Sequence, residues 1–219
     1  KTSNNNKYQV EILISAHGKK SNIDRIMDRE FFQKDADFLG VKYHYKYKVP
    51  SNLVSLHNFK TGYCGVSTVE NEIVNVCYLS TKSSLKKYGT IEELEKNLLW
   101  SNTFLKDIFI NGKNLFSEPK VISDFSFKPK TPVEENVLMI GDAAGLITPL
   151  CGNGMAMAIH AAFIISKLLD EYFSKQINRE ELEKKYTTEW KNNFKSRLDF
   201  GYKIQKMFGK KNISSQVRE

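Results

Sequence analysis

The sequence is poor in cysteine and has no long apolar run. Its 219 residues include three cysteines, Cys64, Cys77 and Cys151, whose wide spacing forms neither a CxxC pair nor a Cys/His metal motif. An odd number of scattered cysteines argues against a disulfide framework, so we expect reduced thiols and no metal site. No stretch approaches the roughly 18 consecutive apolar residues of a membrane-spanning helix, and the first residues lack the pattern of a secretory leader. We therefore expect a cytoplasmic protein.

The sequence also lacks three common signatures of nucleotide and nucleophile chemistry. It contains no GxGxxG, no P-loop GxxxxGKS/T and no G-x-S-x-G. These absences exclude a complete dinucleotide-binding turn, a P-loop and a nucleophile elbow from this stretch of chain. No nucleophile lies beside a general base in a recognisable pattern, so the catalytic residues stay unassigned.

Positive charge is concentrated toward the C-terminal end. The formal net charge is +8, and residues 175–219 contain 12 Lys and Arg against 6 Asp and Glu. Such a segment either contacts an acidic membrane or a partner protein, or forms a solvated helix face. Acidic residues are interleaved throughout it, which favours the solvated face. We expect no nucleic-acid partner and leave peripheral membrane contact open.

The middle of the chain has the pattern of an antiparallel sheet. From Val41 to Lys48, apolar or aromatic residues alternate with polar ones, which predicts a strand with one buried face. Short turns separate three further predicted strands, at 52–59, 62–69 and 73–79. The tyrosines of these strands either form core or line an apolar substrate cavity. A capping box at Thr90 predicts a helix that runs to about Phe109, followed by another strand.

The two ends of the chain have a different pattern. A predicted strand ends at Gly18 and is followed by a short helix capped by Ser21. Near the other end, the apolar stretch "NVLMIG" predicts a buried parallel strand. Two long helices follow it, at Met155–Phe173 and from Arg179 to about Met207.

This double switch in pattern predicts an α/β protein with an α+β insertion. The expected fold is a partial three-layer ligand-binding domain with an inserted antiparallel substrate domain and C-terminal helices. The expected segments are 1–35 and 129–175 for the ligand-binding domain, 36–128 for the substrate domain, and 176–219 for the basic helices.

The most informative stretch is "VLMIGDAAGLITPLCGNGMAMAI", which begins at Val137. Ligands of open α/β sheets bind beyond the carboxyl ends of the strands, and Asp142 there can accept hydrogen bonds from sugar or ribityl hydroxyls. Gly152 and Gly154 let the chain approach a ligand and open a helix, whose first N–H groups favour an anion or an electron-rich ring. The small residues 143–145 would leave room for that ligand. Alternatively, the helix is ordinary core.

This stretch resembles the GD motif of FAD-dependent oxidoreductases with the p-hydroxybenzoate hydroxylase fold, most closely their geranylgeranyl-reductase-like and monooxygenase-like branch. In that family the aspartate binds the ribityl chain of FAD, and the following glycine segment and helix start lie beside the isoalloxazine ring. The resemblance therefore implies FAD as cofactor. The residues it implicates are Gly141, Asp142, Pro149, Gly152, Asn153 and Gly154.

A second stretch, "LISAHGKKSNIDR", resembles the same family's DG fingerprint. His17 and Gly18 align with the Asp-Gly of that fingerprint, so histidine replaces the usual aspartate. His17 would either donate to a phosphate of the cofactor or cap a turn.

The resemblance covers nearly the whole chain in order and implies an FAD-dependent oxidoreductase. The expected reaction is that of an NAD(P)H-linked reductase or a monooxygenase acting on a small apolar substrate. The family's N-terminal GxGxxG unit is absent, so we expect these residues to be the C-terminal portion of a longer enzyme, inactive by itself. The alternative is a non-catalytic basic module that docks on a membrane or a partner protein.

Overall fold

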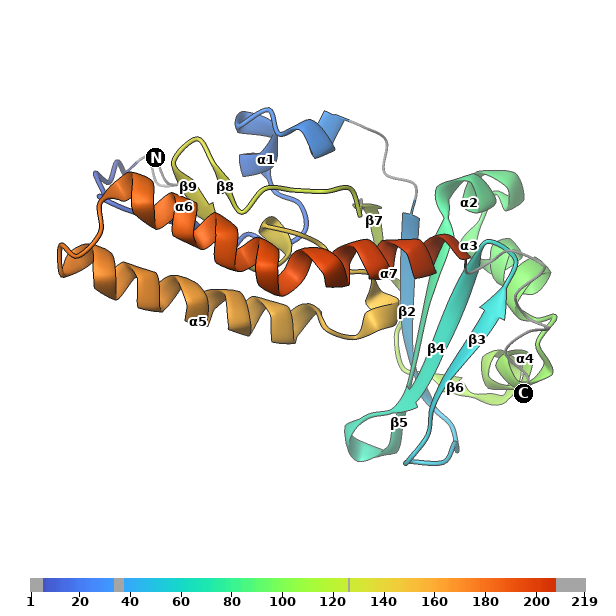
Figure 1. Ribbon diagram of the computed structural model, residues 1–219. Coiled ribbons are helices and arrows are strands. Elements are labelled where there is room, and N and C mark those ends of the chain that lie inside the picture. The colour runs from blue at the N-terminus through green and yellow to red at the C-terminus, as the bar shows by residue number, and fades with distance from the viewer. Residues whose placement is uncertain (1–5, 34–37, 126, 208–219) are drawn as a thin grey trace. The chain divides into compact units, whose positions relative to one another are not determined.

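The computed structural model describes residues 6–33, 38–125 and 127–207. Its contacts divide the chain into two compact units, which are described separately below (Figure 1). Unit 1 comprises residues 1–34 and 127–203, and unit 2 comprises residues 35–126 and 204–219. The last part of the predicted basic segment, from 208 onward, lies outside the described residues.

The sheet of unit 1 is small and mixed, with one parallel and one antiparallel strand pair. It has the order β1-β9-β8, formed by β1 (Leu13–Ser15), β9 (Val137–Met139) and β8 (Val133–Glu134). β1 runs parallel to β9, with Leu13 opposite Val137, which confirms the predicted parallel strand. The first strand is shorter than the predicted one. β1 has three residues, and each of them pairs with one residue of β9.

Helices form most of unit 1. Ser21 caps the first of them with a full capping box, as predicted. The helical elements are α1 (Asn22–Ile26), η1 (Glu30–Gln33), η4 (Gly141–Ala143), η5 (Pro149–Cys151), α5 (Gly154–Phe173), α6 (Arg179–Trp190), η6 (Lys191–Lys195) and α7 (Ser196–Met207).

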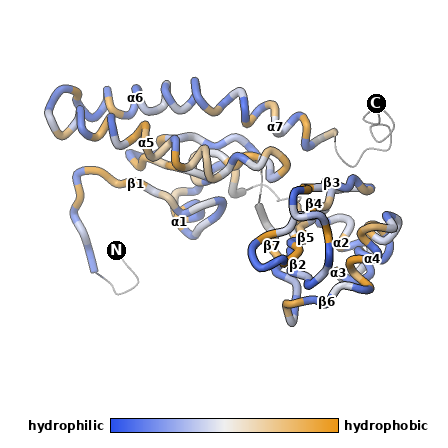
Figure 2. Tube along the Cα trace, turned by 90° about the horizontal axis from the view of Figure 1, so that it is seen from below, coloured by the Kyte–Doolittle hydropathy of each residue, from blue (hydrophilic) through white to orange (hydrophobic). Residues whose placement is uncertain are grey.

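The core of unit 1 lies between α5, α6 and β9. α5 buries Ala161, Ile165 and neighbouring apolar residues in one cluster with Tyr186 of α6, and the two helices run side by side in Figure 1. Figure 2 shows that α5 is largely apolar whereas α6 is mostly hydrophilic. The Tyr186 hydroxyl donates to the carbonyl of Met139 at 2.6 Å, which ties α6 to the end of β9.

Unit 2 is built on a mostly antiparallel meander, as predicted. Its sheet has the order β3-β4-β5-β2-β6, and β7 also pairs with β2. The strands are β2 (Phe38–Lys46), β3 (Val54–Phe59), β4 (Gly62–Thr68), β5 (Ile73–Thr81), β6 (Lys113–Asn114) and β7 (Lys120–Phe125), with the turn η2 (Glu70–Glu72) between β4 and β5.

The helical part of unit 2 corrects one prediction. The single helix expected from Thr90 to Phe109 is two helical stretches, because Asn102 interrupts it and caps the second. The Asn102 side chain accepts hydrogen bonds from the N–H groups of Phe104 and Leu105. The elements are α2 (Lys82–Tyr88), α3 (Ile91–Leu94), the π-helical η3 (Glu95–Leu99) and α4 (Thr103–Asn111).

The alternation predicted for the first strand of unit 2 is confirmed. Val41, Tyr43 and Tyr45 are buried while Lys42 and Lys46 are exposed. The buried tyrosines belong to the core cluster that includes Leu94 and other residues of α3, η3 and α4, so Tyr43 and Tyr45 form core. The predicted α/β class with an antiparallel sheet and C-terminal helices is therefore confirmed. Among the described residues, no helix is long and apolar enough to cross a membrane.

Candidate cofactor site

A pocket of about 370 Å³ lies in unit 1, beyond the carboxyl ends of β1 and β9. Two loops and the start of α5 form it. Its lining residues are Ala16, Gly18, Ile140, Gly141, Asp142, Gly154, Met155 and Ala158. Four of the residues that the sequence indicated for cofactor binding, Gly18, Gly141, Asp142 and Gly154, thus lie around one hollow.

Two turns of this pocket need glycine for their backbone conformation. Gly141 has φ 62° and Gly18 has φ 80°, in the left-handed region that side chains disfavour. A Cβ on Gly141 would also lie 3.2 Å from the Cβ of Ala158 in α5. The glycine therefore allows the turn after β9 to lie directly against the first turns of α5.

Asp142 presents a half-buried carboxylate to this pocket. Burial raises the pKa of the Asp142 carboxyl, while the nearby charges of Lys130 and Lys19 lower it in part. Its Oδ1 lies close to the start of α5, 3.9 Å from the position that a Cβ on Gly154 would take. Because Asp142 lines the pocket, its carboxylate can accept hydrogen bonds from hydroxyl groups of a ligand there.

The start of α5 offers backbone donors to the same pocket. Its N-cap, Asn153, makes no side-chain capping hydrogen bond, and the first-turn residues Gly154 and Met155 line the hollow. The partial positive charge of a helix N-terminus favours anions and electron-rich groups. Pro149 and Gly152 do not line the pocket; they begin and end the turn η5 that leads into α5.

His17 lies behind the pocket wall. Its Nδ1 is 2.7 Å from Ser15 Oγ, and its Nε2 is 2.9 Å from Asp24 Oδ1. Both ring nitrogens thus have partners within the protein, and His17 is not among the lining residues. This geometry favours the interpretation that His17 fixes a turn over direct donation to a phosphate.

Arg29 is a buried cation that the sequence pattern did not reveal. Its guanidinium donates to Asp24 Oδ1 at 2.9 Å, to Glu134 Oε2 at 2.7 Å and to the carbonyl of Ala143 at 3.0 Å. A further donation reaches the carbonyl of Thr131. Arg29 therefore connects α1 to the turn that carries Asp142.

Lys130 is a second cation at this turn, and it is partly buried. Its ammonium donates to the carbonyl of Asp142 at 2.7 Å and to that of Lys19 at 2.9 Å. Burial lowers the pKa of Lys130 to about 8, and the neighbouring Arg29 acts in the same direction. The carbonyls of Asp142 and Ala143, adjacent in the chain, are thus each bonded to a cation.

The small residues after Asp142 have a different role from the one expected. Ala143 and Ala144 are fully buried in the core of unit 1, and a Cβ on Gly145 would lie 2.9 Å from side-chain atoms of Trp190 and Leu198. The expectation that these residues leave space for a ligand is therefore wrong. They leave space for the helical segment that begins with α6.

One sequence signal bears on the ion network of unit 1. Asp24 stands three residues after Ser21, which is the capping-box spacing, so its capping role could have been recognised from the sequence. Arg29 and Lys130 carry no comparable signal, because neither occupies a periodic position or a motif. Apart from Asp24, five positions before Arg29, their partners lie 12 to 114 positions away in the chain.

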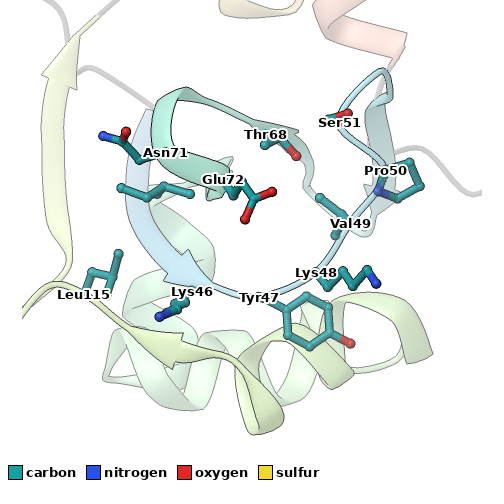
Figure 3. A pocket seen from close by; sticks show the side chains of 11 residues that line it. Lys46, Tyr47, Lys48, Val49, Pro50, Ser51, Thr68, Asn71, Glu72 and Leu115 are labelled. Atoms are coloured by element: carbon teal, nitrogen blue, oxygen red, sulfur yellow. The ribbon is translucent and has the colours of Figure 1, made fainter.

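A larger hollow of about 890 Å³ lies in unit 2, at one end of its sheet (Figure 3). The carboxylate of Glu72 and the hydroxyl of Thr68 point toward its centre, and Lys46 and Lys48 lie at its rim. Exposed connections between strands form much of its wall. None of the residues that the sequence indicated for cofactor binding is among its lining.

The histidines of unit 2 are engaged in packing. The His57 ring stacks on Phe104, with 5.0 Å between centroids, and Asn102 Nδ2 donates to its Nδ1 at 3.1 Å. The His44 ring packs on Phe116 at 4.8 Å. These contacts favour structural roles for both histidines. Within the described residues, no group of three or more His, Cys, Asp or Glu is arranged to hold a metal ion.

Comparison with known proteins identifies the fold. No protein-family profile matches the chain. Over 107 residues, which are 47% of this chain and 27% of the relative, it is 30% identical to digeranylgeranylglycerophospholipid reductase of Methanococcus vannielii. The matched region thus spans about a quarter of that reductase.

Solved structures match almost the whole chain. PqsL of Pseudomonas aeruginosa, a probable FAD-dependent monooxygenase, gives a TM-score of 0.63 at 16% identity and covers 90% of this chain and 56% of its own. A geranylgeranyl bacteriochlorophyll reductase-like protein of Thermoplasma acidophilum gives 0.67 at 17% identity, covering 90% and 50%. The chain shares its fold with both proteins. It spans about half the length of each structure.

Proposed function

We propose that the chain is part of an FAD-dependent oxidoreductase and that the pocket around Asp142 holds the ribityl chain of FAD. The observation that carries this proposal is the meeting of Gly18, Gly141, Asp142 and Gly154 around one hollow, at the carboxyl ends of two parallel strands. This is the position at which open α/β sheets bind ligands. The shared fold with flavoenzymes supports the same assignment.

The residues present fit such a cofactor. The Asp142 carboxylate would accept hydrogen bonds from ribityl hydroxyls, and the two left-handed glycines keep the backbone free of side chains. The uncapped start of α5 would direct its partial positive charge toward the flavin ring. FAD itself would supply the two-electron redox chemistry, while the protein binds and orients it and sets its electrostatic surroundings.

A small apolar substrate is the best-supported class. The reductase of Methanococcus vannielii is named for a glycerophospholipid with two geranylgeranyl groups, which are apolar chains. In unit 2, the sheet face opposite α3 and α4 carries exposed Val54, Leu56 and Ile122. This face would form an apolar wall for the substrate. Reduction and oxygen-dependent hydroxylation both remain within the proposal, with NAD(P)H as the proposed electron donor.

Unit 1 has a surface suited to a further portion of the same polypeptide. Met155, Ile159 and Phe163 recur every four residues on α5 and are 82%, 72% and 55% exposed. β1 pairs only with β9 among the described strands, and its Leu13 is 52% exposed. We propose that a GxGxxG-containing portion covers these residues and completes the cofactor site.

The alternative, a basic module that docks on a membrane or a partner, has weaker support. On the described helices the basic residues are interleaved with acidic ones, and Arg179 and Lys185 form ion pairs with Glu183 and Glu171. Local neutralisation of this kind weakens attraction to an anionic surface. Salt-sensitive binding to anionic vesicles by a flavin-free protein would favour this alternative.

The proposed function is tested by purifying the full polypeptide that carries this chain. We expect a yellow protein whose flavin is bleached anaerobically by NADH or NADPH and recoloured by air. A colourless protein that takes up no FAD on titration would contradict the proposal. A protein that retains FAD without responding to either nicotinamide would contradict only the assignment of the electron donor.

A further inference from the structure

Lys130 joins two loops that are distant in the chain and adjacent at the pocket. The residue that follows Gly18 and the residue that follows Gly141 each give one carbonyl to its ammonium, at 2.9 and 2.7 Å. Gly18 and Gly141 both line the pocket. A single side chain therefore sets the separation of two loops that form the pocket wall.

The remaining surroundings of Lys130 fix its side chain. Its Nζ lies 4.3 Å from the centroid of the Phe31 ring, a favourable cation–π distance. An ammonium has three N–H groups, of which the two carbonyls take two. The ring and the carbonyls together hold the charge in one place beside Asp142.

A lysine is a costly choice for a link of this kind. Taking an ammonium out of water is unfavourable, and an uncharged side chain could donate to carbonyls without that cost. In line with this cost, burial lowers the pKa of Lys130 to about 8. A charge kept in such a place points to a role that a neutral donor would not perform.

The charge acts on Asp142. Burial raises the pKa of the Asp142 carboxyl, and Lys130 is the first of the neighbouring charges that oppose this rise. An ionised carboxylate is an acceptor only, whereas a protonated one also donates. The Lys130 charge therefore favours the form of Asp142 that accepts hydrogen bonds from ligand hydroxyls.

We propose that Lys130 is a positioning residue of the cofactor site, which holds its two loops together and places a positive charge beside Asp142 where the cofactor binds. The proposal rests on the proposed function for the identity of the cofactor. The link between the loops, however, can be tested without any cofactor.

Three substitutions of Lys130 separate its link between the two loops from the effect of its charge. Lys130→Arg keeps the charge and the donors, Lys130→Gln keeps donors without charge, and Lys130→Met removes both. Lys191→Met, at an exposed lysine of η6, is the matched control for loss of one positive charge.

The first measurement is hydrogen exchange in the flavin-free full polypeptide. We expect Lys130→Met to speed exchange at residues 18–20 and 141–145 by roughly tenfold, the factor that corresponds to loss of about 1.4 kcal/mol. Lys130→Arg and the control should match the wild type. Unchanged exchange in Lys130→Met would overturn the link between the loops.

The second measurement is the dissociation constant of FAD as a function of pH. We expect Lys130→Met to weaken binding roughly tenfold or more, Lys130→Gln to weaken it less, and Lys130→Arg to restore it. Wild-type binding should weaken as the pH falls and Asp142 gains a proton, and in Lys130→Met and Lys130→Gln this weakening should begin at a higher pH, because the charge that lowers the pKa of Asp142 is gone. Lys130→Arg should keep the wild-type pH profile, because arginine stays charged.

The charges that face Lys130 are Asp24 and Arg29 from the segment around α1, and Asp142 and Lys19 from the two loops. All four are unchanged in the three variants. Equal FAD binding by Lys130→Gln and the wild type at every pH would overturn the role of the charge. If the wild type binds no FAD, the proposed function fails while hydrogen exchange still decides the link between the loops.

Discussion

The two units of this molecule use buried charge in different ways. In unit 1, Arg29 and Lys130 bond to backbone carbonyls of irregular loops. In unit 2, the buried Glu95 accepts the hydroxyls of Tyr43 and Tyr78, both at 2.8 Å, within a regular sheet-and-helix core. The charges of unit 1 shape a pocket, whereas the charge of unit 2 connects side chains inside the core.

The backbone conformation around these charged residues also differs between the two units. At the unit 1 pocket, Gly18 and Gly141 have left-handed backbone conformations beside the buried ions. Glu95 lies in the short π-helical stretch η3, packed against the sheet. A buried charge by itself therefore does not indicate a ligand site. The candidate site of unit 1 is distinguished by charges that lie beside glycine turns and an open hollow.

The largest expected loss of stability comes from the ion pairs of unit 1, in which Arg29 binds Asp24 and Glu134. Asp24→Ala leaves the buried Arg29 without its buried carboxylate partner, and breaking a buried pair in this way costs about 3–5 kcal/mol. Urea unfolding of the full polypeptide measures the free energy of unfolding. Asp170→Ala, at an exposed position of α5, is the control. Equal stability of both variants would remove the basis for calling this network structural.

The next effect concerns the buried acid of unit 2. Burial raises the pKa of Glu95 from 4.5 to about 7 in the folded protein. The stabilisation it contributes is therefore fully present below about pH 4.5 and is lost as the pH rises through about 7, by about 3 kcal/mol in all. Glu95→Gln should abolish this pH dependence and should be more stable than the wild type at pH 8.

Unfolding midpoints at pH 5 and pH 8 measure this effect. Glu93→Gln, at an exposed position of the neighbouring helix, is the control and should keep the wild-type pH profile. A parallel pH dependence of Glu95→Gln and the wild type would show that Glu95 is not the group that titrates.

A pair of glycine substitutions tests the backbone of the pocket. Gly141→Ala places a Cβ in a left-handed turn and 3.2 Å from Ala158, whereas Gly152→Ala has the same kind of strain with no atom within 4 Å. We expect Gly152→Ala to cost about 1 kcal/mol and Gly141→Ala about 1 kcal/mol more. Thermal unfolding compares them. Equal losses would mean that the turn does not lie tightly against α5.

The smallest expected effect concerns the anchor between α6 and β9. Tyr186→Phe removes the hydroxyl that donates to the Met139 carbonyl and should cost about 1 kcal/mol. Tyr8→Phe, at a 70% exposed tyrosine, is a suitable comparison. A loss below about 0.3 kcal/mol for Tyr186→Phe, within the usual range of surface substitutions, would show that water replaces this bond without cost.

Much of the fold could be predicted from periodicity. The alternation around Val41 and the apolar stretch before Gly141 identified strands of both units, because burial of one or both sheet faces leaves a direct trace in the sequence. The break at Asn102 was missed, since a capping asparagine inside an amphipathic pattern is visible only when its side chain is seen to bond to the next turn.

The site was predictable where local geometry determines it. Gly141, Asp142 and Gly154 follow from a strand–turn–helix pattern, and the structure places all three at one pocket. Lys130 and Arg29 were not predictable, because their roles depend on loops brought together from distant parts of the chain. His17 stood at an informative position, but only the structure shows that Ser15 and Asp24 occupy its ring.

The central claim is that the carboxylate of Asp142 binds the ribityl group of FAD. Its most direct test is the dissociation constant of FAD for the full polypeptide with Asp142→Ala, with Asp142→Asn and Asp170→Ala alongside. We predict a roughly 10- to 100-fold weaker complex for Asp142→Ala, as expected for loss of hydrogen bonds to a charged acceptor, a smaller loss for Asp142→Asn, and wild-type affinity for Asp170→Ala. FAD affinity that is the same in Asp142→Ala and the wild type would contradict the account.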